Sequence, residues 1–361
     1  MTISVVDDLV KLTCDLIRIR STEDRPEQLA AVIDYAAEYL AAVRNVNLHR
    51  SEQEGKPALI ATLHNTTTPT LMLNAHLDVV AARTEQFEPE VRGGRIYGRG
   101  SQDMKGSGTV LLRLLRDLAA LPARPNVGVQ FVTDEEIGGF HGTARLVDEG
   151  WRCAFFIALE PTDLNICYAH KGGMVLDVLC SGAPAHGAKP WEGANPLTTL
   201  GQGLSRLEQR FPSPSMPAWI TTVTPTAIHG GTGSRNQIPP EAVLTLDIRY
   251  IPDDHPSTIA AEVEACFPGG KLSYLHTPPL ATDPQHPMIT RLATLLEHVR
   301  GTAPVLFREH FCTDARFYGA AGIPAICVGP IGAGLHSDEE WVDIASLQQL
   351  HSVLYQFCLE T

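Results

Sequence analysis

Four short apolar segments place the strongest constraint on how this chain can fold. They are rich in Val, Ile, Leu and Phe and lack the alternation of a strand exposed on one face, which is typical of strands buried on both faces of a parallel sheet. These segments are residues 70–75, 127–133, 154–159 and 324–328. Helical apolar spacing occurs at residues 5–19, 26–43, 108–121 and 141–149. We therefore expect an α/β domain with a largely parallel sheet flanked by helices.

The middle of the chain has a different pattern. Predicted strands lie at residues 174–181, 218–228, 242–250 and 271–276, and predicted helices at 195–210 and 257–267. The order β-α-β-β-α-β predicts a ferredoxin-like domain. We expect residues 173–282 to form this domain as an insert, with residues 1–172 and 283–361 forming the α/β domain. A length of 361 residues is compatible with two domains.

Ionisable side chains follow several of the predicted strands or lie in glycine-rich turns. Parallel strands present their carboxyl ends at one edge of a sheet, where ligands bind. The histidines and carboxylates concerned are His76, Asp103, Glu135, Glu136, Glu160 and His336. Burying neighbouring carboxylates is unfavourable unless a cation meets them, and imidazole with carboxylate is a ligand set for Zn²⁺. The sequence therefore predicts a metal site, and a two-metal hydrolase is the function this favours.

The chemistry of amide hydrolysis suggests roles for these residues. Two divalent ions about 3.5–4 Å apart repel each other, so a carboxylate is needed between them, and Asp103 in its glycine-rich turn suits that position. One of two adjacent glutamates can bind metal while the other faces the attacking water, although their spacing does not decide which. We assign Glu136 to the metal and Glu135 to the general base that later protonates the leaving amine. Asp78 is expected to accept the second ring N–H of His76.

Five motifs occur in a specific order along the chain. They are His76-Leu77-Asp78 and residues 100–106, 134–136, 159–161 and 334–339. Together they resemble the zinc-dependent aminoacylase and carboxypeptidase family that includes succinyl-diaminopimelate desuccinylase and acetylornithine deacetylase. The resemblance covers essentially the whole chain and supports Glu135 as the base. It implies two Zn²⁺ ions per subunit, for which Co²⁺ or Mn²⁺ can substitute.

The same resemblance implies a ligand set for each ion. One metal would be held by His76, Asp103 and Glu160, and the other by Asp103, Glu136 and His336. By analogy, the peptide bond after Asp103 would be cis. The insert would serve as a lid and as the dimerisation domain of a homodimer.

Residues outside the metal site would contact the substrate. The resemblance implies that His186 reaches across the dimer to stabilise the oxyanion. It implies that Asn236 and Arg249 hold a substrate carboxylate, which arginine binds with two hydrogen bonds. Lys171 and Arg316 are further candidates for binding an acidic acyl group or a carboxylate.

Two positions bear on the choice of substrate. Cys312 stands where desuccinylases tend to have a hydroxyl residue, which argues against a succinyl substrate. Glu160, rather than Asp, accompanies deacylases and carboxypeptidases more than aminopeptidases within the family. We expect a binuclear metal-dependent amide hydrolase that removes the acyl group from an N-acyl amino acid. A metallo-dipeptidase or carboxypeptidase using the same site, and a non-catalytic metal- or metabolite-binding protein, are the alternatives.

Charge and composition limit the partners and the compartment. The net charge of −13 argues against nucleic acid and anionic membrane as partners. No segment approaches the roughly 20 apolar residues of a membrane helix, and the first residues show no basic and apolar leader. The eight cysteines contain no C-x-x-C pair and are expected to be reduced and buried. We expect a cytoplasmic protein.

Overall fold

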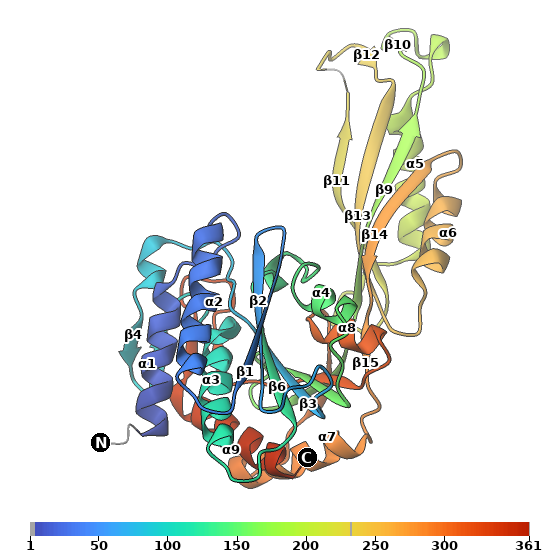
Figure 1. Ribbon diagram of the computed structural model, residues 1–361. Coiled ribbons are helices and arrows are strands. Elements are labelled where there is room, and N and C mark those ends of the chain that lie inside the picture. Colours follow the sequence, from blue (N-terminus) through green and yellow to red (C-terminus); the bar gives the residue numbers. More distant parts are fainter. Residues whose placement is uncertain (1–3, 232, 361) are drawn as a thin grey trace. The chain divides into compact units, whose positions relative to one another are not determined.

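The computed structural model describes residues 4–231 and 233–360, which form two compact units (Figure 1). The first unit contains the described residues up to Ala169, the segment Leu280–Arg308 and the described residues from Thr313 onward. The second unit contains His170–Pro279 together with the short segment Glu309–Cys312. We call the first the catalytic unit and the second the insert.

The catalytic unit is built on a mixed sheet of nine strands among the described residues. The predicted parallel centre is confirmed, because β3 pairs in parallel with β6 and β7, and β7 pairs in parallel with β17. In sheet order the strands are β1 (Asn47–Gln53), β2 (Lys56–Thr62), β6 (Val127–Val132), β3 (Leu71–His76), β7 (Phe155–Ala158), β17 (Ala325–Cys327), β8 (Ile166–His170) and β15 (Leu280–Ala281), with β16 (Leu306–Glu309) paired to β8.

Helices cover both faces of this sheet. Successive side chains of a strand point to opposite faces, so Leu59 and Ala61 join one core cluster while Ala58 and Ile60 join another. This two-sided burial explains the continuous apolar runs. The helices of the first cluster are α1 (Val5–Arg18), α2 (Pro26–Ala41), α3 (Gly106–Ala119), α7 (Pro287–Arg300) and α9 (Ile344–Leu359). Those of the second are α4 (Thr143–Asp148) and α8 (Ala315–Ala320) (Figure 1).

A second, smaller sheet in the catalytic unit supports two of the candidate ligand segments. Its strands are all antiparallel, in the order β18 (Gly332–Ala333), β19 (Trp341–Asp343), β5 (Arg95–Tyr97) and β4 (Glu90–Arg92). β5 leads into the glycine-rich segment that contains Asp103, and the connection between β18 and β19 contains His336. Short helical turns complete the unit at Thr84–Phe87 (η1), Ser101–Lys105 (η2) and Glu135–Ile137 (η3).

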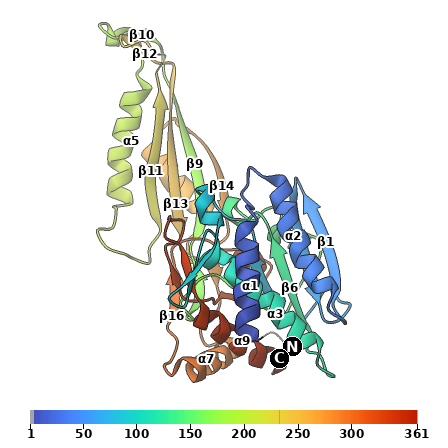
Figure 2. The same cartoon turned by 90° about the vertical axis from the view of Figure 1, so that its left-hand side faces the viewer.

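The insert has the predicted β-α-β-β-α-β order. Its elements are β9 (Gly172–Ser181), α5 (Pro196–Arg210), β11 (Thr222–Gly230), β13 (Glu241–Tyr250), α6 (Pro256–Cys266) and β14 (Lys271–Thr277), with the short turn η4 (Pro190–Glu192). The antiparallel sheet runs β11-β13-β9-β14. Alternate residues of β13 are buried in the core that the sheet forms with α5 and α6. Figure 2 shows α5 alongside the strands of this sheet. A short pair, β10 (Ala185–His186) with β12 (Gln237–Ile238), lies at one end of the insert.

Two further expectations can be compared with the structure. All eight cysteines are free thiols, and six of them are buried as expected, whereas Cys153 and Cys312 are only partly buried. Within the described residues, no helix has both the length and the apolar character needed to cross a membrane.

Candidate metal centre

The candidate ligands lie at the carboxyl ends of three neighbouring parallel strands. His76 is the last residue of β3, the turn Glu135–Ile137 follows β6, and Glu160 follows β7. Because β3 pairs in parallel with both β6 and β7, these ends meet at one edge of the sheet. The topology thus brings together side chains that are far apart in the sequence.

Asp103 lies between two histidines. The Nε2 atom of His76 is 3.0 Å from one carboxyl oxygen of Asp103, and the Nε2 atom of His336 is 3.2 Å from the other. The structure places two groups of potential ligand atoms within 4.8 Å of one another: His76, Asp103 and Glu160, and Asp103, Glu136 and His336. Asp103 is common to both groups. The peptide bond from Asp103 to Met104 is cis.

The electrostatics of this cluster favour positive charge. Hydrogen bonds to Asp103 and Glu136 raise the pKa of His336 to about 10. Burial lowers the pKa of His76, but the carboxylates of Asp103 and Asp78 close to the ring outweigh it and raise the pKa well above the usual value. Burial alone would raise the pKa of the Asp103 carboxyl, yet the hydrogen bonds from both histidines hold it well below its usual range. A divalent cation would satisfy the same carboxylates more fully than protons do.

Glu160 provides an independent indication that a cation belongs here. Its side chain is buried, and its Oε1 atom has no hydrogen-bond partner among the described residues. Burial, and the nearby Asp103 carboxylate, raise the pKa of Glu160 well above its usual range, although the charge of His76 opposes this. A buried carboxylate oxygen without a donor is costly unless something else satisfies it. The residues present therefore fit a pair of divalent ions, with oxygen and imidazole donors suited to zinc.

Glu135 lies beside the ligand groups but belongs to neither. Its side chain is only 14% exposed, and its Oε1 atom is 3.9 Å from the Nη1 atom of Arg316. Burial and the Glu160 carboxylate raise the pKa of Glu135 well above its usual range. The raised pKa means that this carboxyl group holds a proton more readily than an exposed glutamate, which suits a group that takes up a proton and then passes it on.

We expected the Asp78 carboxylate to accept the second ring N–H of His76, but in the structure the backbone carbonyl of Asp78 lies closer to this ring nitrogen. The ring Nδ1 atom of His76 is 3.0 Å from the backbone carbonyl oxygen of Asp78, whereas the nearer carboxylate oxygen is 3.6 Å away. The other carboxylate oxygen of Asp78 accepts a hydrogen bond from the backbone N–H of Glu136 at 3.1 Å. Asp78 therefore contacts both the His76 ring and the turn that carries the paired glutamates.

Arg316 lies within the catalytic unit, next to the turn that follows β6. The side chain is 2% exposed and its Nη2 atom donates to the carbonyl oxygen of Gly138 at 2.6 Å. Its Nε and Nη1 atoms have no hydrogen-bond partner among the described residues. Two guanidinium donors of this buried cation are therefore without a described partner, and substrate contact by Arg316 stays a prediction.

Sequence reasoning missed Glu340, whose wholly buried carboxylate contacts the segment that carries Asp103. Glu340 lies just beyond the motif at residues 334–339, but its contact is with residues about 240 positions earlier. No local spacing could have indicated that contact.

The candidates in the insert fall into two pairs. His186 lies on β10, and its Nε2 atom is 3.4 Å from the side-chain nitrogen of Asn236, next to β12. Lys171 and Arg249 both line a pocket of about 410 Å³. These two places lie at opposite ends of the ten-residue strand β13, which spans roughly 30 Å at about 3.3 Å per residue.

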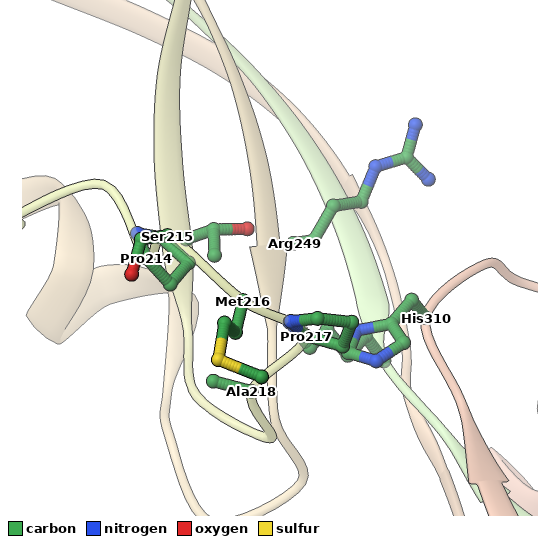
Figure 3. A pocket seen from close by; sticks show the side chains of 9 residues that line it. Pro214, Ser215, Met216, Pro217, Ala218, Arg249 and His310 are labelled. Carbon is green, nitrogen blue, oxygen red and sulfur yellow. The ribbon is translucent and has the colours of Figure 1, made fainter.

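The pocket is lined by the loop 214–218, Thr222 and His310 as well as by the two cationic residues (Figure 3). Lys171 is 2% exposed and has no carboxylate partner among the described residues. Burial and the charge of Arg249 lower the pKa of Lys171. The Arg249 guanidinium contacts both oxygens of Asp247, at 2.9 and 3.0 Å. The pocket therefore holds one buried cation without a counter-ion, a feature suited to an anionic ligand.

The fold and the site define a class of protein, a two-unit α/β protein with two candidate metal-binding groups that share one carboxylate, and with an inserted domain. The family model described as "Peptidase family M20/M25/M40" matches residues 72–360, and the chain belongs to this family. It is therefore a hydrolase that acts on amide bonds.

Sequence relatives agree with this assignment. A succinyl-diaminopimelate desuccinylase from Xanthomonas campestris is 28% identical over 99% of both chains. A protein of the same name from Stenotrophomonas maltophilia is 31% identical over 82% of this chain and 85% of its own length.

Solved structures share the fold. An aminopeptidase PepT from Bacillus cereus has a TM-score of 0.80 at 17% identity, with 98% of both chains covered. A metallo-carboxypeptidase of the M20 family from Sulfolobus solfataricus has a TM-score of 0.78 at 17% identity, with the same coverage. A dinuclear metal-binding peptidase of the M20 family from Bacillus subtilis has a TM-score of 0.70 at 15% identity, also covering 98% of both chains.

Proposed function

We propose that this protein removes the acyl group from an N-acyl amino acid, with two zinc ions bound by the ligand sets that share Asp103. The observation that carries the proposal is the presence of a further buried carboxylate, Glu135, beside those two sets. When bound, the ions would lower the pKa of water to about 7 and polarise the substrate carbonyl. Cobalt or manganese can take the place of zinc, since geometry rather than raw affinity decides occupancy.

Glu135 performs the proton transfers of this reaction. Its carboxylate takes a proton from water as the water oxygen attacks the carbonyl carbon. The resulting carboxylic acid then gives that proton to the leaving nitrogen as the C–N bond breaks. Burial and the Glu160 carboxylate raise the pKa of Glu135. The Glu135 carboxylate is therefore a stronger base toward water than an exposed glutamate would be, and the two proton transfers are more evenly matched.

The insert supplies the groups that bind the rest of the substrate. We propose that Lys171 and Arg249, in the pocket of the insert, bind a substrate carboxylate, that Asn236 contributes to the same carboxylate site from the other subunit of a dimer, and that His186 stabilises the oxyanion. His186 and Asn236 lie at the opposite end of β13 from Lys171 and Arg249. This separation supports a homodimer in which His186 acts in the partner's site, and we place that dimer in the cytoplasm.

The names of the sequence relatives favour release of an acyl group from an amino acid. Cys312 lies in the insert with its Sγ atom 4.0 Å from the Nη1 atom of Arg249 and 3.2 Å from the carbonyl oxygen of Lys171. A thiol is a weaker hydrogen-bond partner than a hydroxyl for a second carboxylate. We therefore expect a smaller or less acidic acyl group than succinyl.

A Glu135→Gln variant tests the assignment of the base. The amide cannot accept a proton, so we expect hydrolysis to fall by about 10²–10⁴-fold while two metal ions remain bound. Glu136→Gln is the matched comparison, because the adjacent change should reduce metal content as well as activity. Rates on acetylated, formylated and succinylated amino acids and metal content by atomic absorption provide the measurements. Full turnover by Glu135→Gln would contradict the proposed role.

A metallo-dipeptidase or carboxypeptidase is the second candidate. It is favoured by the structural neighbours, which include a tripeptidase from Staphylococcus aureus and the metallo-carboxypeptidase from Sulfolobus solfataricus. Including dipeptides in the same substrate panel separates the two candidates, because a peptidase will cleave them faster than any N-acyl amino acid.

A further inference from the structure

A buried carboxylate outside both ligand sets contacts the segment that carries Asp103. The Glu340 side chain is 0% exposed, and both of its oxygens accept hydrogen bonds. One oxygen accepts from the backbone N–H groups of Gln102 and Asp103, at 3.0 and 3.1 Å. The other accepts from the backbone N–H of Gly100 at 2.9 Å and from the Arg99 guanidinium at 2.7 Å. A single carboxylate thus contacts four donors of one short segment.

Glu340 also belongs to the hairpin that carries His336. It directly precedes β19, and its backbone carbonyl oxygen accepts a hydrogen bond from the N–H of Gly98 at 3.1 Å. β19 then pairs with β5, where Val342 lies opposite Ile96. The main chain and the side chain of Glu340 therefore connect the segments of two candidate ligands, Asp103 and His336.

The charge and the hydrogen bonds of Glu340 show that it is not itself a ligand. Both oxygens already face donors, and the guanidinium of Arg99, which is 3% exposed, balances the carboxylate charge. By contrast, the buried Oε1 atom of Glu160 has no donor among the described residues. The Glu160 carboxylate is thus available to a cation, whereas the Glu340 carboxylate is already occupied by hydrogen bonds from the backbone and from Arg99.

Holding that backbone matters because Asp103 belongs to both ligand sets. Ligand atoms must stay within about 0.5 Å of their productive positions for a metal site to keep its affinity. The backbone N–H of Asp103 donates a hydrogen bond to the Glu340 carboxylate. Because the Asp103 side chain is short, its carboxyl group follows any movement of this backbone. A shift of this segment would move both carboxyl oxygens of Asp103 at once.

We propose that Glu340 is a positioning residue of the metal centre, which holds the Asp103 segment so that its carboxylate faces both ligand sets. This inference rests on the proposed metal centre and is independent of the substrate. It predicts that changes at Glu340 weaken metal binding before they impair the chemical step.

Glu340→Asp and Glu340→Gln test the inference in complementary ways. Aspartate keeps the charge opposite Arg99 but is one methylene too short to reach all four donors. Glutamine keeps the length but has only one oxygen to accept hydrogen bonds. Glu339→Gln, at the exposed neighbouring position, is the control. Zinc and cobalt affinities are measured by calorimetric titration of the metal-free proteins, and folding by circular dichroism.

We expect metal affinity to fall by about 10–100-fold in both Glu340 variants, as for other residues that orient metal ligands. Hydrolysis should recover to within a few-fold of the wild-type rate at saturating metal, and Glu339→Gln should behave as the wild type. The recovery distinguishes positioning from participation in the chemical step. Glu340→Asp carries the test if Glu340→Gln does not fold, because its ion pair with Arg99 is retained.

Unchanged metal affinity in a folded Glu340→Asp variant would overturn the inference, even if its melting temperature were lower. That result would leave Glu340 with a role in stability alone. A wild-type protein that binds two metal ions but cleaves no N-acyl amino acid would instead refute the proposed substrate, and Glu340 would keep its role. A wild-type protein that binds no divalent metal would refute both.

Discussion

At the scale of single residues, the site is organised by how each buried carboxylate is satisfied. Asp103 faces two histidines, Glu340 faces four donors, and Glu160 has an oxygen that faces none. Glu135 lies near a guanidinium at 3.9 Å, beyond hydrogen-bond distance. The four side chains have the same functional group, yet their surroundings suit them to bridging, positioning, metal binding and proton transfer.

Arg316 provides a prediction at this scale. It is the described cation that forms an ion-pair contact with Glu135, and it donates a hydrogen bond to the turn that carries this residue. In Arg316→Met, we expect kcat to fall by roughly tenfold or more with little change in KM, because the base loses its nearby charge and support. Steady-state kinetics at saturating metal, with metal content measured in parallel, will check this.

The same variant separates two roles for Arg316. A substrate-binding arginine, the role for which Arg316 was a further candidate, would give a raised KM with kcat unchanged. Stability supplies the control. Although Nε and Nη1 lack hydrogen-bond partners among the described residues, methionine removes the hydrogen bond to the Gly138 carbonyl and the charge beside Glu135, so we expect a lower melting temperature, and the kinetics are measured well below it. If Arg316→Met were unfolded at the assay temperature, its loss of activity would be explained by misfolding.

At the scale of elements, the turn after β6 determines where both glutamates point. Gly138 and Gly139 end this turn with φ values of +112° and +66°, a region that favours glycine. A Cβ atom on Gly139 would lie 2.9 Å from the ring of Phe317 and would overlap the carboxylate of Asp314. The turn is thus held against α8 with no room for a larger residue.

Gly139→Ala should displace this turn. We expect a loss of roughly 2–4 kcal/mol in the free energy of unfolding, from the left-handed backbone and the collision together, and weaker metal binding through Glu136. Gly301→Ala is a matched control, because Gly301 has a φ of +73° with nothing within 4 Å of the added atom. It should lose only about 1–2 kcal/mol and keep its metal. Denaturant unfolding and metal titration of both variants test the expectation, and equal effects would contradict it.

The elements differ in how well the sequence predicts them. Strands buried on both faces, such as β3 and β6, give continuous apolar runs that predict them within one or two residues. β1 was missed because it pairs only with β2 at the sheet edge and is largely exposed, so it carries no apolar pattern. β2 (Lys56–Thr62) was also missed, although its last five residues are buried like those of β3. In the insert, the alternating burial of β13 made that strand easy to predict.

Parts of the candidate site could be predicted wherever the residue type and the surrounding motif were enough to identify a metal ligand. His76, Asp103 and His336 stood out as ligand types at strand ends or glycine-rich turns. The environment of a residue is not encoded in its local sequence, so the burial of Arg316 could not be foreseen. Nor could the contact between Glu340 and Gly100, because folding alone brings those segments together.

At the scale of the whole molecule, the two units have separate hydrophobic cores. Two clusters fill the catalytic unit on either side of its sheet, and a third lies between the sheet and the helices of the insert. All of the proposed metal ligands belong to the catalytic unit, whereas His186, Asn236, Arg249 and Lys171 belong to the insert. Metal binding and substrate anchoring are thus assigned to units with independent cores.

This division predicts how metal affects thermal unfolding. A ligand that binds only the folded catalytic unit stabilises that unit by about 2.7 kcal/mol at a hundred times its Kd, which corresponds to roughly 5–10 °C for a unit of this size. Differential scanning calorimetry of the metal-free protein should show two transitions, of which zinc raises one and leaves the other unchanged. Glu136→Gln should reduce the shift without moving the second transition. Equal shifts of both transitions, or a single transition under all conditions, would mean that the two units unfold together and that the separation of their cores does not extend to their stability.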